Sequence, residues 1–207
     1  MRQDHSRKTI LNQMTVPYNQ KYGFQLPKNL CGSYTYYIEA SITGKTSTSL
    51  TGLFVGGHCA TKIVKTFWTT KQNSLNETEN HVFSFGEVIF LQLNTEGLNG
   101  DIVIVEIYNK QLFGDKLVRT ITQVQVIDGE VNVKISNSYL WKGQLWFTLG
   151  EEEFYAKIKN PATGQYISDS TKESSKIFKI KNEIVTKSTD KPTNIVPLKI
   201  GKVNVML

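Results

Sequence analysis

Short runs of alternating apolar and polar residues recur along this chain, and they constrain its fold more than any other feature. In residues 81–93 one face holds Phe83, Phe85, Ile89, Leu91 and Leu93, and in residues 130–135 the side chains of Val131, Val133 and Ile135 share one face. Because successive side chains of a β-strand point to opposite faces, such runs predict strands with one buried face. They recur at intervals of roughly 8 to 15 residues with no helical apolar period between them, which is typical of an all-β sandwich.

Glycine-containing turns separate the predicted strands. An Asp-Gly pair at 128–129 lies between two alternating runs, and an Asn-Gly pair at 99–100 precedes another. Such pairs favour the two-residue turns that join adjacent antiparallel strands. The sequence therefore predicts an all-β, antiparallel sandwich. Trp68 and Trp146 each lie within an alternating run and are expected in its core.

The composition divides the chain into three parts. Residues 1–33 lack sustained periodicity and contain Pro17 and Pro27, so we expect an extended N-terminal arm. Residues 34–165 hold the alternating runs and are expected to form the β-sandwich, as one unit or as two small subdomains. Residues 166–207 are expected to add an extra strand or a hairpin, followed by an extended, Lys-rich tail.

The formal net charge of +6 is concentrated at the two ends of the chain. Residues 1–33 and residues 166–207 each carry a net charge of +4, whereas the residues between them carry −2. A protein that recognises nucleic acid is expected to gather Lys and Arg on one folded surface, and only three of the 24 basic residues are Arg. We therefore expect solvated basic arms and no specific nucleic-acid partner.

The two cysteines, Cys31 and Cys59, are too few for a disulfide-built scaffold or for a structural zinc site. His58 precedes Cys59, but neighbouring side chains on a strand point apart and do not readily chelate one ion. The sequence thus predicts no metal and no cofactor. It leaves open whether Cys31 and Cys59 are bridged or remain two thiols near the core.

Local signatures of catalysis are missing from the sequence. It contains no Gly-x-Ser-x-Gly nucleophile elbow, no phosphate-binding loop and no His-Glu-x-x-His zinc helix. A Cys–His pair could still be assembled in space from Cys31 or Cys59 with His58 or His81, because such pairs are defined by geometry. The acidic residues 151–153 favour a solvated turn over a catalytic or calcium site. On balance we expect a protein that is not an enzyme.

No apolar run approaches the roughly 18 to 20 residues that a membrane-spanning helix requires. The N-terminal twenty residues also lack the continuous apolar segment and the small-residue cleavage site of a secretory signal. We therefore expect a soluble protein without a transmembrane segment that is cytoplasmic when made. Any export would depend on an apparatus that needs no signal peptide.

Two connections between predicted strands carry large apolar side chains. Leu112 and Phe113 lie in one of them, and Tyr139 and Trp141 lie in the other. Side chains at such positions either pack under their own loop or are offered to a partner, and the sequence leaves both alternatives open. These four residues are the candidate partner-binding residues.

Several turn and strand motifs between residues 61 and 135 carry a resemblance to known modules. They are Phe-Gly-Glu-Val at 85–88, Glu-Gly-Leu-Asn-Gly-Asp at 96–101 and the hairpin over 126–133, and the stretches 159–167 and 180–185 add to them. Together they resemble an immunoglobulin-like module of Bacteroidota proteins from contractile-injection or type VI secretion loci. The resemblance implies an immunoglobulin-like β-sandwich and a link to such an apparatus. It implies no active-site residue, because its motifs are structural turns.

Three classes of function follow from these observations. The first is a non-catalytic protein-binding or assembly module, part of or carried by a bacterial contractile-injection or type VI secretion apparatus, whose basic arms dock onto neighbouring proteins. The second is a secreted or injected effector, such as a toxin, with an active patch that no motif reveals. The third is a carbohydrate-binding sandwich.

Overall fold

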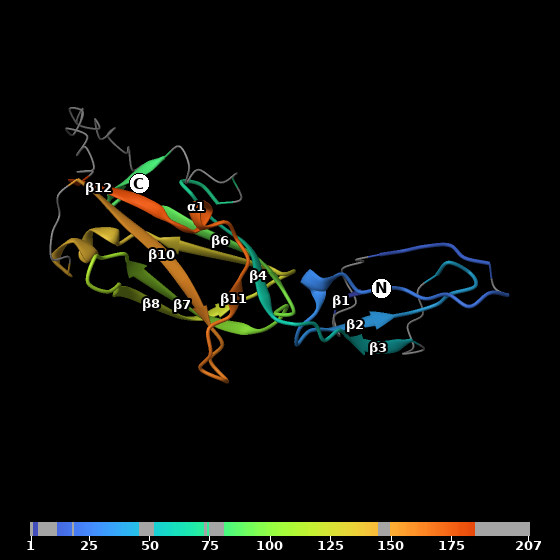
Figure 1. Ribbon diagram of the computed structural model, residues 1–207. Helices are drawn as coiled ribbons and strands as arrows, with labels where there is room; N and C mark the ends of the chain where they lie inside the picture. The colour runs from blue at the N-terminus through green and yellow to red at the C-terminus, as the bar shows by residue number, and fades with distance from the viewer. Residues whose placement is uncertain are drawn as a thin grey trace, which may run out of the picture.

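The computed structural model describes residues 2–3, 12–17, 19–45, 52–72, 74, 81–144 and 150–184. Strands predominate among them, as the sequence predicts (Figure 1). The strands are β1 (Arg2–Gln3), β2 (Thr35–Ile38), β3 (Leu53–Gly56), β4 (Lys62–Thr69), β5 (Val82–Phe85), β6 (Ile89–Glu96), β7 (Ile102–Asn109), β8 (Lys116–Gln125), β9 (Glu130–Ile135), β10 (Glu151–Lys159), β11 (Ser168–Asp169) and β12 (Phe178–Ile184). The helical elements are short: η1 (Lys28–Leu30), η2 (Ser138–Gln144) and α1 (Glu173–Lys176).

Strands β4 to β12 form two sheets in a sandwich-like arrangement. The five-stranded sheet has the order β5-β12-β10-β7-β8 and the four-stranded sheet has the order β11-β4-β6-β9. The prediction of a mostly β, sandwich-like fold is confirmed. The antiparallel prediction is wrong for two strand pairs, because β11 runs parallel to β4 and β12 runs parallel to β5.

The C-terminal segment explains these parallel pairs. The sequence predicts an extra strand or a hairpin there; β11 and β12 do not pair with each other as a hairpin would, and each joins a different sheet. β12 lies between β5 and β10, where Phe178 and Ile180 are fully buried. Residues 145–149, which include Trp146, and the tail 185–207 lie outside the described residues.

Large aromatic side chains fill the space between the two sheets. Trp68 of β4 is fully buried, and its ring centroid lies 4.0 Å from that of Phe178 of β12. The Trp68 indole N–H donates a hydrogen bond of 2.8 Å to the backbone carbonyl of Lys176, so its one polar group is satisfied. Phe178 in turn stacks on Phe154 of β10 with centroids 5.5 Å apart. The predicted core position of Trp68 is confirmed.

The tight turn at Asp128-Gly129 is present, but its strands diverge. Ile127 and Glu130 form a single antiparallel bridge, after which β8 and β9 enter different sheets. Asp128 and Gly129 have φ angles of 54° and 78°, as a type I′ turn requires. A side chain at Gly129 would also collide with the backbone carbonyl of Asn29. Glycine is therefore required at this position on both grounds.

Strands β1, β2 and β3 form a separate three-stranded sheet, the N-terminal sheet, which lies to one side of the sandwich (Figure 1). The sequence places residues 34–56 in the sandwich and residues 1–33 in an arm, whereas in the structure β1 pairs with β2 and β2 pairs with β3. Tyr36 and Tyr37 of β2 are fully buried. Their burial gives this sheet a small packed centre of its own.

A covalent and hydrogen-bonded junction attaches the N-terminal sheet to the sandwich. Cys31 and Cys59 form a disulfide, which settles the alternative that the sequence left open. Asn99, just after β6, is fully buried at the junction. Its Nδ2 donates to the Tyr36 hydroxyl at 2.6 Å, and its Oδ1 accepts a hydrogen bond of 3.3 Å from the backbone N–H of Gly129.

Candidate interaction surface

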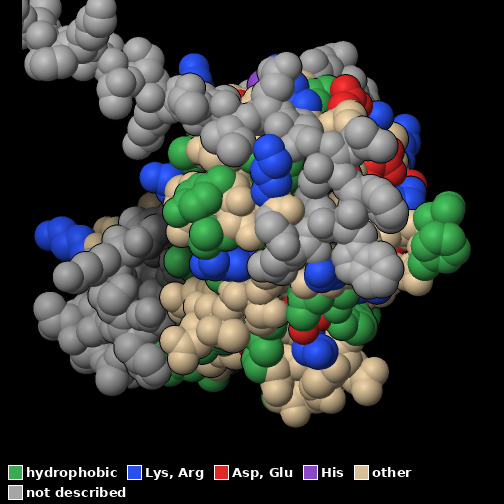
Figure 2. Space-filling view, turned by 90° about the vertical axis from the view of Figure 1, so that its left-hand side faces the viewer, with side chains coloured by type: hydrophobic (Ala, Val, Ile, Leu, Met, Phe, Trp, Pro, Cys, Tyr) green, Lys and Arg blue, Asp and Glu red, His purple; other side chains and the backbone are tan. Residues whose placement is uncertain are grey.

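The connection between β7 and β8, residues 110–115, exposes two large apolar side chains. Leu112 is 90% exposed and Phe113 is 96% exposed, so neither packs beneath its own loop. We name this connection the apolar tip. It lies at the end of the sandwich far from the N-terminal sheet (Figure 1), and Figure 2 views the molecule from that end, where some hydrophobic side chains are exposed.

Hydrogen bonds hold the base of the apolar tip. The backbone N–H of Lys110 donates to the carbonyl oxygen of Glu153 on β10 at 2.8 Å. Across the loop, the backbone N–H of Gln111 donates to Asp115 Oδ1 at 3.3 Å. The two apolar side chains are thus presented at a defined place on a rigid scaffold, as in loops that make contacts with partners.

The second candidate connection behaves differently. Tyr139 is 50% exposed on η2, but Trp141 is only 2% exposed, and its ring centroid lies 5.3 Å from that of Phe154. Trp141 thus packs under its own connection, the first of the two alternatives that the sequence left open, and a contact of this side chain with a partner stays an untested prediction. The 3₁₀ turn places Tyr139 outward and directs the larger apolar indole into the core, where its burial stabilises the fold.

Three tyrosines gather on the outer surface of the five-stranded sheet. Tyr108 of β7 and Tyr155 of β10 are register partners, and their rings stack with centroids 5.6 Å apart. Tyr166 follows β10 in a loop, and its hydroxyl lies 3.1 Å from that of Tyr108. The Lys157 ammonium lies between 4.9 and 5.6 Å from the centroids of all three rings, within cation–π range. We name these residues, with Glu106, the tyrosine face.

The Glu106 carboxylate holds the hydroxyls of Tyr108 and Tyr166 in place. The Glu106 side chain is nine-tenths buried. Glu106 Oε2 accepts hydrogen bonds of 2.8 Å from both the Tyr108 and Tyr166 hydroxyls, and Oε1 accepts one of 3.3 Å from Lys159 Nζ. All the donors converge on one carboxylate, so the positions of the two rings are tied together.

The charge state of this network is set by burial and hydrogen bonding. Desolvation alone would raise the pKa of Glu106, but the hydrogen bonds from Tyr166, Tyr108 and Lys159 outweigh it and lower the pKa. Desolvation, together with the hydrogen bonds to Tyr166 and the Glu106 carboxylate, raises the pKa of Tyr108. Glu106 therefore stays ionised and Tyr108 stays a protonated donor, which suits a fixed binding surface better than proton transfer.

The apolar tip and the tyrosine face form one continuous surface. The Tyr155 hydroxyl donates a hydrogen bond of 2.5 Å to Asp115 Oδ2 at the base of the tip. Burial, together with this contact, raises the pKa of Tyr155. Acidic and basic side chains are mixed on this end of the molecule, as Figure 2 shows, and at the tip Lys110 pairs with Glu153 at 3.4 Å. We name the tip and the face together the interaction surface.

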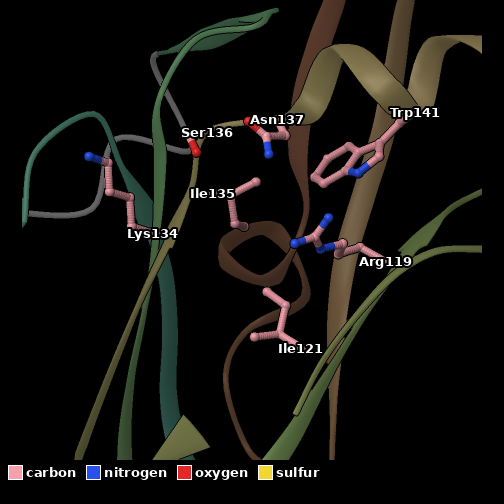
Figure 3. A pocket seen from close by; sticks show the side chains of 7 residues that line it. All are labelled: Arg119, Ile121, Lys134, Ile135, Ser136, Asn137 and Trp141. Carbon is pink, nitrogen blue, oxygen red and sulfur yellow. The ribbon is translucent and has the colours of Figure 1, made fainter. Parts of the chain in front are cut away.

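A small cleft also opens between the two sheets, beside β8 and β9 (Figure 3). Arg119, Ile135 and Trp141 converge on it, whereas Lys134 points away. Its volume is about 40 Å³, which leaves room for only a few water molecules. The cleft is therefore too small to be a site for an organic ligand.

The described residues bring together no cluster for the chemistry that the sequence left open. Both cysteines are in the disulfide, so neither offers a thiol to His58 or His81. Within the described ranges, three or more His, Cys, Asp or Glu side chains nowhere gather as they would around a metal ion. In the same part of the chain, no helix is long and apolar enough to cross a membrane.

No protein-family model matches this chain, and no curated protein matches it in sequence. The interpretation of the surface therefore rests on its own geometry and on the sequence motifs.

The sequence indicated the apolar tip but not the tyrosine face. Alternation in β7 does place Glu106 and Tyr108 on the outward face, and this is a signal that the sequence contains. The approach of Tyr166 to Tyr108, however, joins residues 58 positions apart. Contacts of that range depend on how β7 pairs with β10, which no local pattern reports.

Proposed function

We propose that this protein is a non-catalytic binding module of a multiprotein assembly and that it contacts a partner protein through the interaction surface. The observation that carries this proposal is the exposure of Leu112 and Phe113 on a tip whose base is fixed. In the isolated chain these two side chains add nothing to the core. Burying each on a partner would stabilise a complex by roughly 1.5 to 3 kcal/mol before the costs of association.

The tyrosine face supports the same proposal. Tyrosine combines a large apolar ring with a polar hydroxyl and has few rotatable bonds, and it is enriched where proteins bind one another. Tyr166 is half-exposed on this face while its hydroxyl is held by Glu106. Such pre-positioning reduces the entropy lost on binding.

The N-terminal sheet supports an assembly with more than one contact. Phe24, Leu53 and Phe54 are 50%, 66% and 37% exposed on this part of the molecule, at the end opposite the apolar tip. Large apolar side chains that stay exposed on a projecting element are candidates for contact with a partner. We propose that this end docks onto a second neighbouring protein.

The turn motifs noted in the sequence support an immunoglobulin-like organisation of the two sheets and a bacterial contractile-injection or type VI secretion apparatus as the assembly. Both are part of the proposal. The Cys31–Cys59 disulfide supports a destination outside the reducing cytosol, because disulfides persist in oxidising compartments.

Comparative affinity purification tests the proposal. Tagged wild-type protein and the Leu112→Ser/Phe113→Ser variant are purified from the source cell, and the co-purified proteins are quantified by mass spectrometry. We expect at least one co-purified protein to be about tenfold or more less abundant with the variant than with the wild type. A tenfold loss of affinity corresponds to about 1.4 kcal/mol of binding free energy. The thermal midpoint should not change, because the two side chains are solvated.

The Ile127→Ser variant is the matched control, since Ile127 is 52% exposed on a different connection. It should retain the same co-purified proteins as the wild type. An identical set of proteins with all three forms would contradict the proposal. So would a large drop in the thermal midpoint of the tip variant, because it would assign the tip a folding role.

A further inference from the structure

The outer surface of the four-stranded sheet carries a separate hollow of about 350 Å³. It lies on the opposite side of the sandwich from the tyrosine face, so it is independent of the proposed protein contact. Its volume falls in the range of roughly 300 to 1,000 Å³ found for small-molecule sites. The polar and aromatic residues that line it are Phe67, Ser74, Gln92, Asn94, Glu130 and Asn132.

Strand register arranges this lining in rows. Phe67, Gln92 and Asn132 lie opposite one another across β4, β6 and β9. Asn94 and Glu130 lie in the next row on β6 and β9, which Lys65 of β4 continues at the margin of the hollow. The five lining residues belong to regular strands, so their backbones are fixed by sheet hydrogen bonds and the site is largely preformed.

Gln92 is the residue that most directly points to a ligand. It is only 6% exposed. Its Nε2 donates to Thr69 Oγ1 at 2.7 Å, and the Thr69 hydroxyl donates to the carbonyl of Lys71 at 2.6 Å. This chain of hydrogen bonds fixes one end of the amide and turns Oε1 away from Thr69.

No group among the described residues donates a hydrogen bond to Gln92 Oε1. Buried polar atoms in folded proteins are almost always hydrogen-bonded. A buried amide oxygen that lines a hollow and lacks a donor is therefore a place where a ligand hydroxyl would be held.

The composition of the lining identifies the class of ligand. Three amides offer both donors and acceptors, which matches hydroxyl groups that also act as both. Phe67 supplies an apolar ring, and Lys65 Nζ packs 4.8 Å from its centroid. The residues that line the hollow include no Lys or Arg, and the negative charge of Glu130 is set against the positive charge of the neighbouring Lys65, so the hollow has no excess of positive charge that would select an anion. We infer that the hollow binds a neutral carbohydrate, with its hydroxyls on the amides and one sugar face against Phe67.

Saturation-transfer NMR on the full chain tests this inference with neutral probes: maltohexaose, cellohexaose, xylohexaose, mannohexaose and chitohexaose. At least one probe should bind with a Kd of about 1 mM or tighter. Asn132→Ala and Gln92→Leu should each weaken that binding by about tenfold, and the second keeps the buried volume filled. Lys134→Ala, an exposed change on β9 outside the lining, should leave the Kd unchanged.

Four outcomes would overturn the inference. They are the absence of saturation transfer to all five probes, unchanged binding by the Asn132→Ala variant, a requirement for added calcium, and tighter binding of adenosine than of any sugar. Asn132 is exposed, so its replacement by alanine should leave the fold intact even if the Gln92 variant does not fold.

Discussion

Trp141 and Tyr139 lie two residues apart, and their burial assigns them opposite roles. Because Trp141 is 2% exposed and packs on Phe154, Trp141→Ala should destabilise the protein by about 3 to 5 kcal/mol through a core cavity. Tyr139→Ala removes a half-exposed ring and should cost less than about 1 kcal/mol. Urea denaturation measures both free energies of unfolding. Equal losses would show that the buried position of Trp141 does not hold in solution.

Glu106 makes the tyrosine face sensitive to acid. Its pKa is lowered in the folded protein, so its carboxylate adds stability that is fully present above its unfolded pKa of about 4.3. This stability is lost as the pH falls through the lower folded pKa. The Glu106→Gln variant should therefore be less stable than the wild type near neutral pH, and it should lose less stability on acidification. Thermal midpoints recorded across the acid range provide the measurement, and parallel curves would rule out this role for Glu106.

At the scale of elements, local patterns were sufficient to predict the strands and turns but not to predict which strands pair with each other. The alternation in 130–135 correctly predicted β9, and the Asp-Gly pair correctly predicted the turn before it. The same signal favoured pairing of β8 with β9, yet the two strands enter different sheets. Likewise, nothing local in residues 178–184 indicates insertion between β5 and β10, because that pairing is chosen by tertiary contacts.

For the candidate surface, too, local patterns predicted features within one connection but not contacts between strands. The tip was visible in the sequence because Leu112 and Phe113 are apolar within a turn-rich connection. The tyrosine face was not, since it requires β7 and β10 to be neighbours. The burial of Trp141 could not be predicted, because composition alone does not tell a packed aromatic side chain from a solvated one.

The Cys31–Cys59 disulfide is expected to stabilise the N-terminal sheet. It closes a segment with a sequence separation of 28 residues that contains β2 and β3. Closure of a loop of that length is worth about 3 to 4 kcal/mol in the chain-entropy model. Reduction with dithiothreitol should therefore destabilise the N-terminal sheet and leave the sandwich largely folded.

Limited proteolysis followed by mass spectrometry checks this prediction. Cleavage of the reduced protein should be confined to residues 19–60, while the segment from β4 to β10 is protected. The Cys31→Ser/Cys59→Ser variant should behave like the reduced protein. An unchanged cleavage pattern after reduction would contradict this role of the disulfide and would show that the hydrogen bonds across the junction are sufficient to hold it.

At the scale of the whole molecule, three parts of the surface have distinct characters. The five-stranded sheet carries the apolar tip and the tyrosine face, the four-stranded sheet carries the amide-lined hollow, and the N-terminal sheet projects from one end. The net positive charge belongs to the ends of the chain, and the central residues are nearly balanced. We therefore expect binding at the interaction surface to depend weakly on salt, because the contact relies on apolar area more than on exposed charge.

Site-specific photo-crosslinking tests the central claim most directly. A benzophenone amino acid replaces Phe113 in one form of the protein and Ile127 in another, and both are irradiated in the source cell. We predict a discrete covalent adduct with a partner protein from position 113 and none from position 127, since only the first lies on the interaction surface. Adducts of equal yield from both positions, or an adduct from position 127 alone, would contradict the assignment of the apolar tip as the partner-binding site.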